Sequence, residues 1–189
     1  MSGFQLCESS EAVIERRNSL KTLSKSFTTN RIVNNMLILA TNAHILHTSR
    51  GGHPFIMHPI RVSAALRTTD VELQAIALGH DLFNHETGID VSHLRNAHMS
   101  ERVIGSIKKM TRQRGMSTSE YVQEICTDTD AMEVTLRCIL DITDIIIMPP
   151  DTREKVSEAH QMYIYIKDKL QESVIKKSIA GRKADGWIV

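Results

Sequence analysis

Apolar residues recur along most of this 189-residue chain at intervals of three and four, the spacing that places them on one face of an α-helix. No segment shows the regular alternation of apolar and polar residues that is typical of a half-buried strand. The sequence therefore predicts an all-α fold of helices joined by short loops. The predicted helices span residues 11–26, 30–48, 58–66, 70–83, a short stretch from 91, 101–111, 117–125, 130–148 and 152–176.

Several of these helices have recognisable ends. Asp70 is placed to cap the N-terminus of its helix, and Ser117 with Glu120 matches a capping box. Pro149 and Pro150 end the long apolar helix, because proline cannot continue it.

The composition is that of an ordinary globular domain, with 41% hydrophobic residues, 24% charged residues and a net charge of +1. Such a balance argues against a nucleic-acid interface, and no apolar run is long enough to cross a membrane. The three cysteines form no CxxC pair, so we expect reduced thiols that pack as small apolar groups in a cytoplasmic protein. We expect one domain, in which residues 1–29 add an N-terminal helix to a body at 30–176, and residues 177–189 form a C-terminal tail.

Histidine is concentrated in one region, since eight of the nine lie between His44 and His98. Within it, the segment LGHDLFNHETG (78–88) places His80 and Asp81 at the end of an almost wholly apolar helix. An ionised carboxylate in such surroundings must be paired or bound to a metal. An ordinary hydrogen bond between the two side chains would also satisfy the pattern.

Two further segments carry polar groups in apolar surroundings. His58 precedes Pro59, which favours an extended backbone at the mouth of the next helix. In CILDITDIIIM, Asp141 and Asp144 are three residues apart and share a helix face. Arg137 lies one turn before Asp141 and can satisfy it, which leaves a divalent cation as the simplest partner of Asp144.

The predicted metal ligands are therefore His58, His80, Asp81 and Asp144. Mixed nitrogen and oxygen ligation suits one divalent ion such as Mn²⁺ or Fe²⁺, with Zn²⁺ as an alternative. No thiolate is placed by the sequence pattern to favour a structural zinc site.

Three blocks in this order resemble the HD-domain hydrolases of the RelA/SpoT type, especially the small alarmone hydrolases such as metazoan SpoT homologues. The blocks are HILHTSRGGHPFIMHP (44–59), HDLFNHET (80–87) and DITDIIIM (141–148), and the likeness extends over residues 35–170. The resemblance implies a single HD-domain helical bundle that holds one ion, usually Mn²⁺, on the four predicted ligands. It also implies hydrolysis of the 3′-pyrophosphate of ppGpp by a metal-activated water.

The chain departs from that family where the water would be activated. The family has a Glu-Asp pair after the HD dipeptide, and an ungapped alignment puts Asn84 and His85 there. A one-residue insertion would bring Glu86 to the glutamate position instead. Asparagine cannot accept a proton, whereas His85 and Glu86 can, so these three are the candidate catalytic residues.

The expected substrate contacts also differ from those of the family. Ser49 and Arg50 stand in place of an Arg-Lys pair, and Met148 replaces a nucleotide-contacting asparagine. Arg61 is a further candidate for a phosphate contact, and the basic run at 108–114 is either a solvated helix end or an anion-binding rim.

Three functions are compatible with these features. The first is hydrolysis of a ppGpp-type nucleotide, and the second is hydrolysis of another nucleotide, such as NADPH or a dNTP, by the same chemistry. The third is a catalytically impaired HD protein that binds a nucleotide or a protein partner. All three predict a small-molecule or protein partner, and a homo-oligomer is compatible with each.

Overall fold

The computed structural model describes residues 30–49, 52–84, 87–145 and 153–184, with the side chains of all of these except 143–145, 153–156 and 177–184. Within these ranges the chain is all-α, as predicted. Its eight helices are accompanied by no strand, and the β-structure of the described part is one bridge between Thr48 and Pro54. The helix predicted at 11–26 lies outside the described residues.

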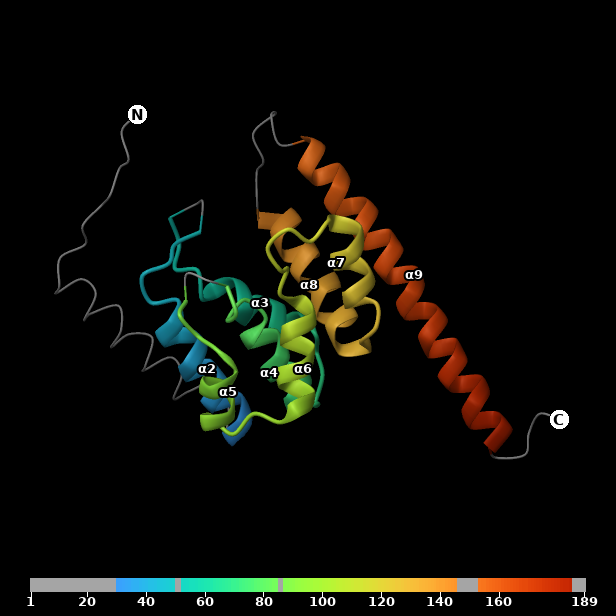
Figure 1. Ribbon diagram of the computed structural model, residues 1–189, viewed down its shortest axis with the longest axis horizontal. Coiled ribbons are helices and arrows are strands. Elements are labelled where there is room, and N and C mark those ends of the chain that lie inside the picture. Colours follow the sequence, from blue (N-terminus) through green and yellow to red (C-terminus); the bar gives the residue numbers. More distant parts are fainter. Residues whose placement is uncertain (1–29, 50–51, 85–86, 146–152, 185–189) are drawn as a thin grey trace.

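Figure 1 shows the order of the helices along the chain. They are α2 (Arg31–Ala43), α3 (Met57–Ala65), α4 (Val71–Gly79), α5 (Val91–Asn96), α6 (Glu101–Met110), α7 (Thr118–Ile125), α8 (Thr129–Ile145) and α9 (Arg153–Ala184).

The largest differences from the prediction are at the ends of three helices. Helix α2 ends at Ala43 rather than at 48, and α9 continues to Ala184 instead of ending at 176. Helix α4 ends at Gly79 rather than at 83, because the chain then closes tighter turns. The first of these is made by the N–H of Leu82, which donates to the carbonyl oxygen of Gly79 at 3.0 Å.

The predicted caps are confirmed. The Asp70 carboxylate accepts hydrogen bonds from the backbone N–H groups of Glu72 and Leu73 at the start of α4. At the start of α7, Ser117 and Glu120 form both halves of a capping box. These contacts satisfy N–H groups that have no partner inside the helix.

Helix α4 is at the centre of the core. It is apolar on every side and packs against α2, α3, α6 and α8, so residues 75–80 are all buried. Its C-terminal end, and with it His80, is therefore held in the interior.

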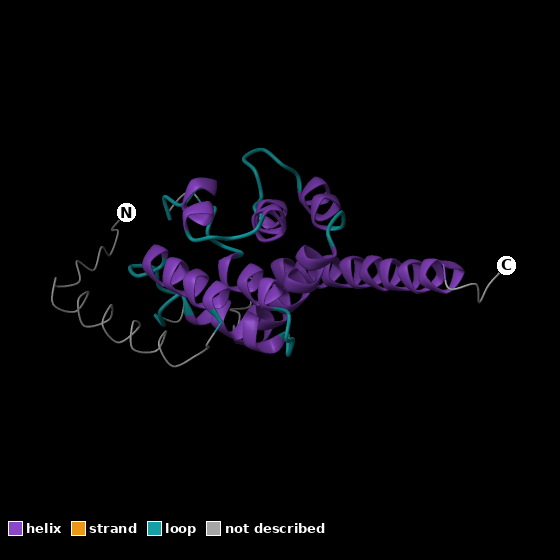
Figure 2. Ribbon diagram, turned by 90° about the horizontal axis from the view of Figure 1, so that it is seen from below, coloured by secondary structure: helices purple, strands orange, loops and turns teal. Residues whose placement is uncertain are grey.

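Figures 1 and 2 both show α9 running past the rest of the helices. The largest fully buried side chains are Met36, Ile56, Ile76, Leu82, Leu94, Ile104, Ile107, Ile125, Met132 and Ile166.

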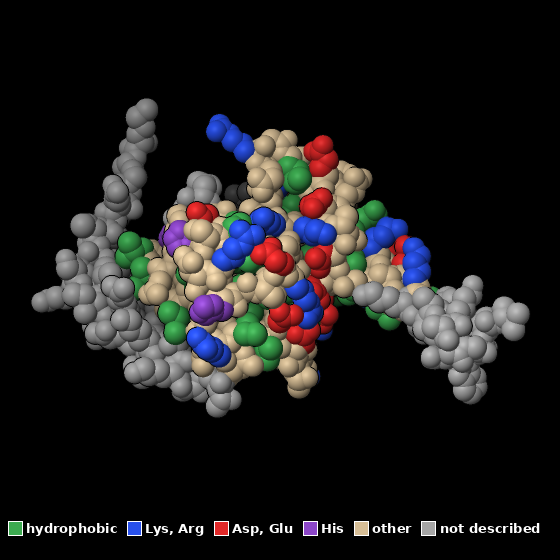
Figure 3. All heavy atoms as spheres, turned by 60° about the horizontal axis from the view of Figure 1, so that its bottom comes forward, with side chains coloured by type: hydrophobic (Ala, Val, Ile, Leu, Met, Phe, Trp, Pro, Cys, Tyr) green, Lys and Arg blue, Asp and Glu red, His purple; other side chains and the backbone are tan. Residues whose placement is uncertain are grey.

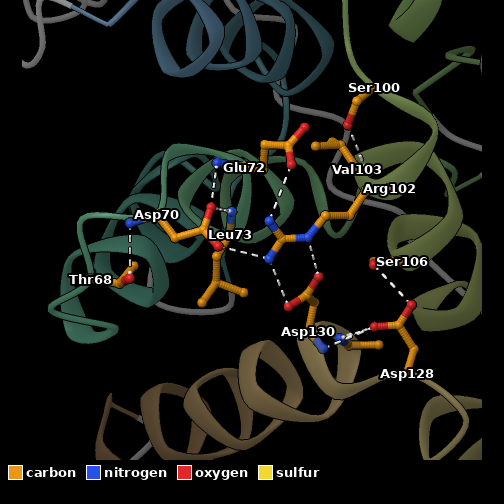
Figure 4. Close-up of polar contacts among 11 residues, drawn as sticks. Thr68, Asp70, Glu72, Leu73, Ser100, Arg102, Val103, Ser106, Asp128 and Asp130 are labelled. Atoms are coloured by element: carbon orange, nitrogen blue, oxygen red, sulfur yellow. Dashed lines mark hydrogen bonds and ion pairs between the residues drawn. The ribbon is translucent and has the colours of Figure 1, made fainter.

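One arginine joins the starts of three helices (Figure 4). The guanidinium of Arg102 in α6 donates to Asp70 at 2.7 Å, to Glu72 at 3.1 Å and to Asp130 at 2.7 Å. Each partly exposed pair contributes only about 0.2–1 kcal/mol, but together they join the first turns of α4, α6 and α8.

The surface shows no large area of one charge on the face seen in Figure 3, where acidic and basic side chains lie side by side. Across the described residues, no helix combines the length and the apolar character that a membrane span requires.

Candidate metal centre

Four polar side chains from three parts of the fold meet at the end of α4. His58 lies in the first turn of α3, and His80 and Asp81 follow the last residue of α4. Cys138 comes from α8. The backbone of His58 is helical, not extended as predicted from Pro59, because α3 begins one residue earlier and its first turn tolerates a proline.

The potential ligand atoms of these residues are close together. The Nε2 atoms of His58 and His80 are 3.2 Å apart, and His80 Nε2 lies 3.1 Å from Asp81 Oδ2. Cys138 Sγ lies 3.5 Å from His58 Nε2. Ligands bound to one zinc-sized ion at about 2.0–2.3 Å are separated by similar distances. The group formed by His58, His80 and Cys138 could therefore hold a metal ion.

The tautomers of the two imidazoles favour a cation between them. His80 Nδ1 lies 2.7 Å from the carbonyl oxygen of Ala77, which can only accept, so this Nδ1 carries the proton. His58 Nδ1 donates in the same way to Asp141 Oδ2 at 2.7 Å. Two Nε2 lone pairs then face each other, and they repel unless a proton or a metal ion lies between them. Orientation of a ligand imidazole through its other nitrogen is typical of metal sites.

The electrostatics of the two imidazoles lead to the same conclusion. Burial lowers the pKa of His58, but contacts with Cys138 and Asp141 outweigh it and raise that pKa above the ordinary value. Burial also lowers the pKa of His80, but Asp81 and Cys138 raise it well above the ordinary value. The site thus attracts positive charge, and protons compete with a metal ion for it.

The two acidic groups of the site are shifted in the opposite direction. Burial raises the pKa of Asp81, but the adjacent His80 and His58 outweigh it and lower that pKa to about 2. For Cys138, hydrogen bonds with the same two histidines overcome the effect of burial and lower the thiol pKa to about 7. A thiol of this kind is a thiolate in a large fraction of molecules near neutral pH, and the thiolate is the form that binds metals.

Asp141 supports the site instead of facing it. The Nε of Arg61 donates to its Oδ1 at 2.8 Å, and Arg61 Nη2 donates to its Oδ2 at 3.0 Å. Together with His58, this arginine occupies both carboxylate oxygens. Arg137 was predicted to pair with Asp141. This prediction was wrong, because the arginine bonded to Asp141 is Arg61 of α3, eighty residues away. Arg61, predicted to contact phosphate, donates from two of its nitrogens to this ion pair, and its phosphate contact stays a prediction.

The other predicted site residues fall into two groups. Asn84 lines the same cleft as His80 and Asp81, whereas Ser49 lies in the turn after α2, where its N–H donates to the carbonyl oxygen of His53. The backbone of Asp144 belongs to α8, but its side chain is outside the described part of the structure. The remaining candidates lie outside the described residues, and they are Arg50, His85, Glu86 and Met148.

Sequence reasoning missed Cys138. Its thiol lies beside the imidazoles, so the expectation that no thiolate is placed near the site was wrong. A signal was present in the sequence, because Cys138 precedes Asp141 by three residues and such residues share a helix face. A lone cysteine in an apolar helix, however, usually acts as a small apolar residue.

The site opens onto a cleft of about 1100 Å³, lined in part by His80 and Asp81. The Asp81 side chain is 33% exposed, whereas that of His80 is only 4% exposed, so the carboxylate is the more accessible of the two. Helix α6 and the loop after it add Lys108, Arg112 and Arg114 to the lining. The cleft therefore combines a potential cation site with basic side chains that can bind phosphate oxygens.

Comparison of the sequence with protein-family models and with curated proteins gave no match.

Proposed function

We propose that this protein is a metal-dependent phosphohydrolase of the HD type that acts on a nucleotide, with guanosine 3′,5′-bis(diphosphate) as the leading substrate. The observation that carries the proposal is the convergence of His58 Nε2, His80 Nε2 and Asp81 Oδ2 at the wall of a cleft. The order of the sequence blocks that contain these residues supports the choice of reaction and of substrate.

A divalent ion held there would lower the pKa of a bound water and neutralise charge on the phosphate. The protein's own contribution begins with Asp141, which fixes His58 in the tautomer that presents Nε2 to the site. Ala77 does the same for His80 through its carbonyl oxygen. Asp81, with a pKa of about 2, remains ionised throughout the physiological range.

Basic side chains that line the cleft would bind the phosphate groups of the nucleotide. Arg114 is exposed and makes no ion pair with any described residue, so its charge is available to a ligand. Arg112 and Lys108 line the same space. These side chains all come from residues 108–114, and not from the segments that contain Ser49 and Arg61.

This last feature favours a second candidate, hydrolysis of a different nucleotide by the same site. A pocket whose cations come from α6 and the following loop can orient another phosphorylated nucleoside, such as NADPH or a dNTP. The reaction class is unchanged, and only the substrate differs.

Chromatographic assay of the purified protein with Mn²⁺ or Zn²⁺ tests the proposal on ppGpp, pppGpp, NADPH and dNTPs. We expect release of pyrophosphate from ppGpp, and at least a 100-fold loss of rate (about the upper end for changes around a metal site) in Asp81→Asn. Asp168→Asn, which removes an exposed carboxylate on α9, is the matched control and should retain the rate. Turnover of another nucleotide would establish the second candidate, and no turnover of any would refute both.

A further inference from the structure

We propose that Cys138 is a protein ligand of the metal centre, and that its thiolate makes the site select Zn²⁺ over Mn²⁺. The inference rests on the proposed function only in requiring that the site bind a divalent ion. It concerns which residue of α8 completes the site and which class of ion the donor set prefers.

The geometry gives Cys138 the position of a ligand. The ligand atoms of Cys138, His58 and His80 all lie within 4.8 Å of one another, and Cys138 Sγ is 3.5 Å from His58 Nε2. Asp81 Oδ2 lies 3.1 Å from His80 Nε2 and 3.9 Å from His58 Nε2. Two imidazoles and one thiol therefore lie within reach of a single ion, and the Asp81 carboxylate lies beside both imidazoles.

The neighbouring carboxylate of α8 does not compete for this role. Both oxygens of Asp141 already accept hydrogen bonds, from Arg61 and from His58 Nδ1. Asp141 is thus bonded to the outer nitrogen of His58, on the side of the ring away from the other donors. Its function is to orient the imidazole, and among the described side chains of α8 the Cys138 thiol is the group close to both Nε2 atoms.

The aspartate predicted as the α8 ligand is further along the same helix. Asp144 follows Cys138 by six residues, which corresponds to a rise of about 9 Å in an α-helix. Among the side chains that the structure describes, Cys138 is the α8 group with a potential ligand atom close to both His58 and His80. We therefore assign a ligand position on α8 to Cys138, and the predicted role of Asp144 stays a prediction.

The donor chemistry then determines the ion. Thiolate is a soft ligand that favours zinc, whereas Mn²⁺ prefers carboxylate, carbonyl and water oxygens. For any set of nitrogen, oxygen and sulfur ligands, affinity is also lower for Mn²⁺ than for Zn²⁺. On binding, the Cys138 thiol loses its proton to the solvent, so uptake of the ion releases acid.

Cobalt substitution tests the assignment without an activity assay. Co²⁺ bound to the wild-type protein should give an intense sulfur-to-cobalt charge-transfer absorption in the near ultraviolet. Cys138→Ser should abolish this band, and Cys126→Ser should retain it, because Cys126 is not part of the group. A wild-type protein that binds Co²⁺ without the band, or a Cys138→Ser protein that keeps it, would overturn the inference.

A second measurement needs no serine variant. In equilibrium dialysis against Zn²⁺ and Mn²⁺ together, the wild-type protein should retain zinc. Cys138→Asp replaces sulfur by oxygen and should reduce the Zn²⁺-to-Mn²⁺ affinity ratio by at least about 10-fold. Equal retention of both ions by the wild-type protein contradicts the inference but leaves the proposed hydrolase intact. Failure to bind any divalent ion contradicts both.

Discussion

His44 is a single buried residue that makes the stability of the fold depend on pH. Its side chain is buried, and its Nδ1 lies 3.0 Å from His47 Nδ1, while its Nε2 has no hydrogen-bond partner among the described residues. Its ring also packs against Phe55, with centroids 4.8 Å apart. Burial, only partly offset by the charge of Asp81, lowers the pKa of His44 to about 4.

This shift predicts that acid destabilises the fold through His44. Between pH 6.5 and about 4 the unfolded chain binds a proton at His44 that the folded chain does not. The stabilisation present above pH 6.5 is therefore lost as the pH falls, by about 3 kcal/mol over the whole interval. The raised pKa values of His58 and His80 act in the opposite sense, because their contribution is present at low pH and is lost as the pH rises through those values.

Urea unfolding of the wild-type protein and of His44→Gln, in the presence of a chelator, separates the two effects. As the pH falls from 6.5 to 4, the unfolding free energy of the wild type should decrease more than that of His44→Gln. The exposed His53→Gln change serves as the control and should leave the pH dependence unaltered. Parallel curves for wild type and His44→Gln would show that the His44 pKa is not lowered.

At the scale of the elements, Gly79 lets three helices approach each other directly before the metal centre. A Cβ at this position would lie 2.7 Å from Met36 Sδ in α2 and 2.9 Å from Ile107 Cδ1 in α6. Both contacts are closer than packed atoms allow, so one or both side chains would have to move. The next residue is His80, whose position depends on this packing.

We expect Gly79→Ala to destabilise the protein by about 1 kcal/mol or more, as overpacked cores commonly do, even though alanine is the better helix former. Gly105→Ala in α6 is the matched control, because a Cβ there meets no atom within 4 Å. It should stabilise the fold by about 0.5–1 kcal/mol. Chemical denaturation measures both, and a Gly79→Ala protein as stable as Gly105→Ala would refute the close packing of α4.

At the same scale, helix positions were largely predictable and helix ends were not. The 3.6-residue period located the described helices, and side-chain caps such as Asp70 and Ser117 marked their starts. The end of α4 carries no such mark, because LGHDLF continues the apolar pattern beyond Gly79. The turn that lifts His80 and Asp81 out of the helix depends on the surrounding fold, which a local pattern does not contain.

At the scale of the whole molecule, the site depends on contacts between distant parts of the chain. The sequence identified His58, His80 and Asp81, since each carries a polar group into apolar surroundings, and the structure brings these three together. It did not identify Cys138, and it assigned the wrong cation to Asp141. The contacts of Asp141 with Arg61 and of Cys138 with His58 join α3 to α8 across about eighty residues. Nothing in the local sequence distinguishes Arg61 from the nearer Arg137 as the partner of Asp141.

Metal content is the measurement that tests the central claim most directly. The purified protein, loaded with a divalent ion and dialysed, should contain one ion per chain by elemental analysis. His80→Ala should lose it, whereas His47→Ala, which removes an imidazole outside the ligand group, should keep it. A wild-type protein without bound metal, or a His80→Ala protein that still holds one ion per chain, would contradict the account.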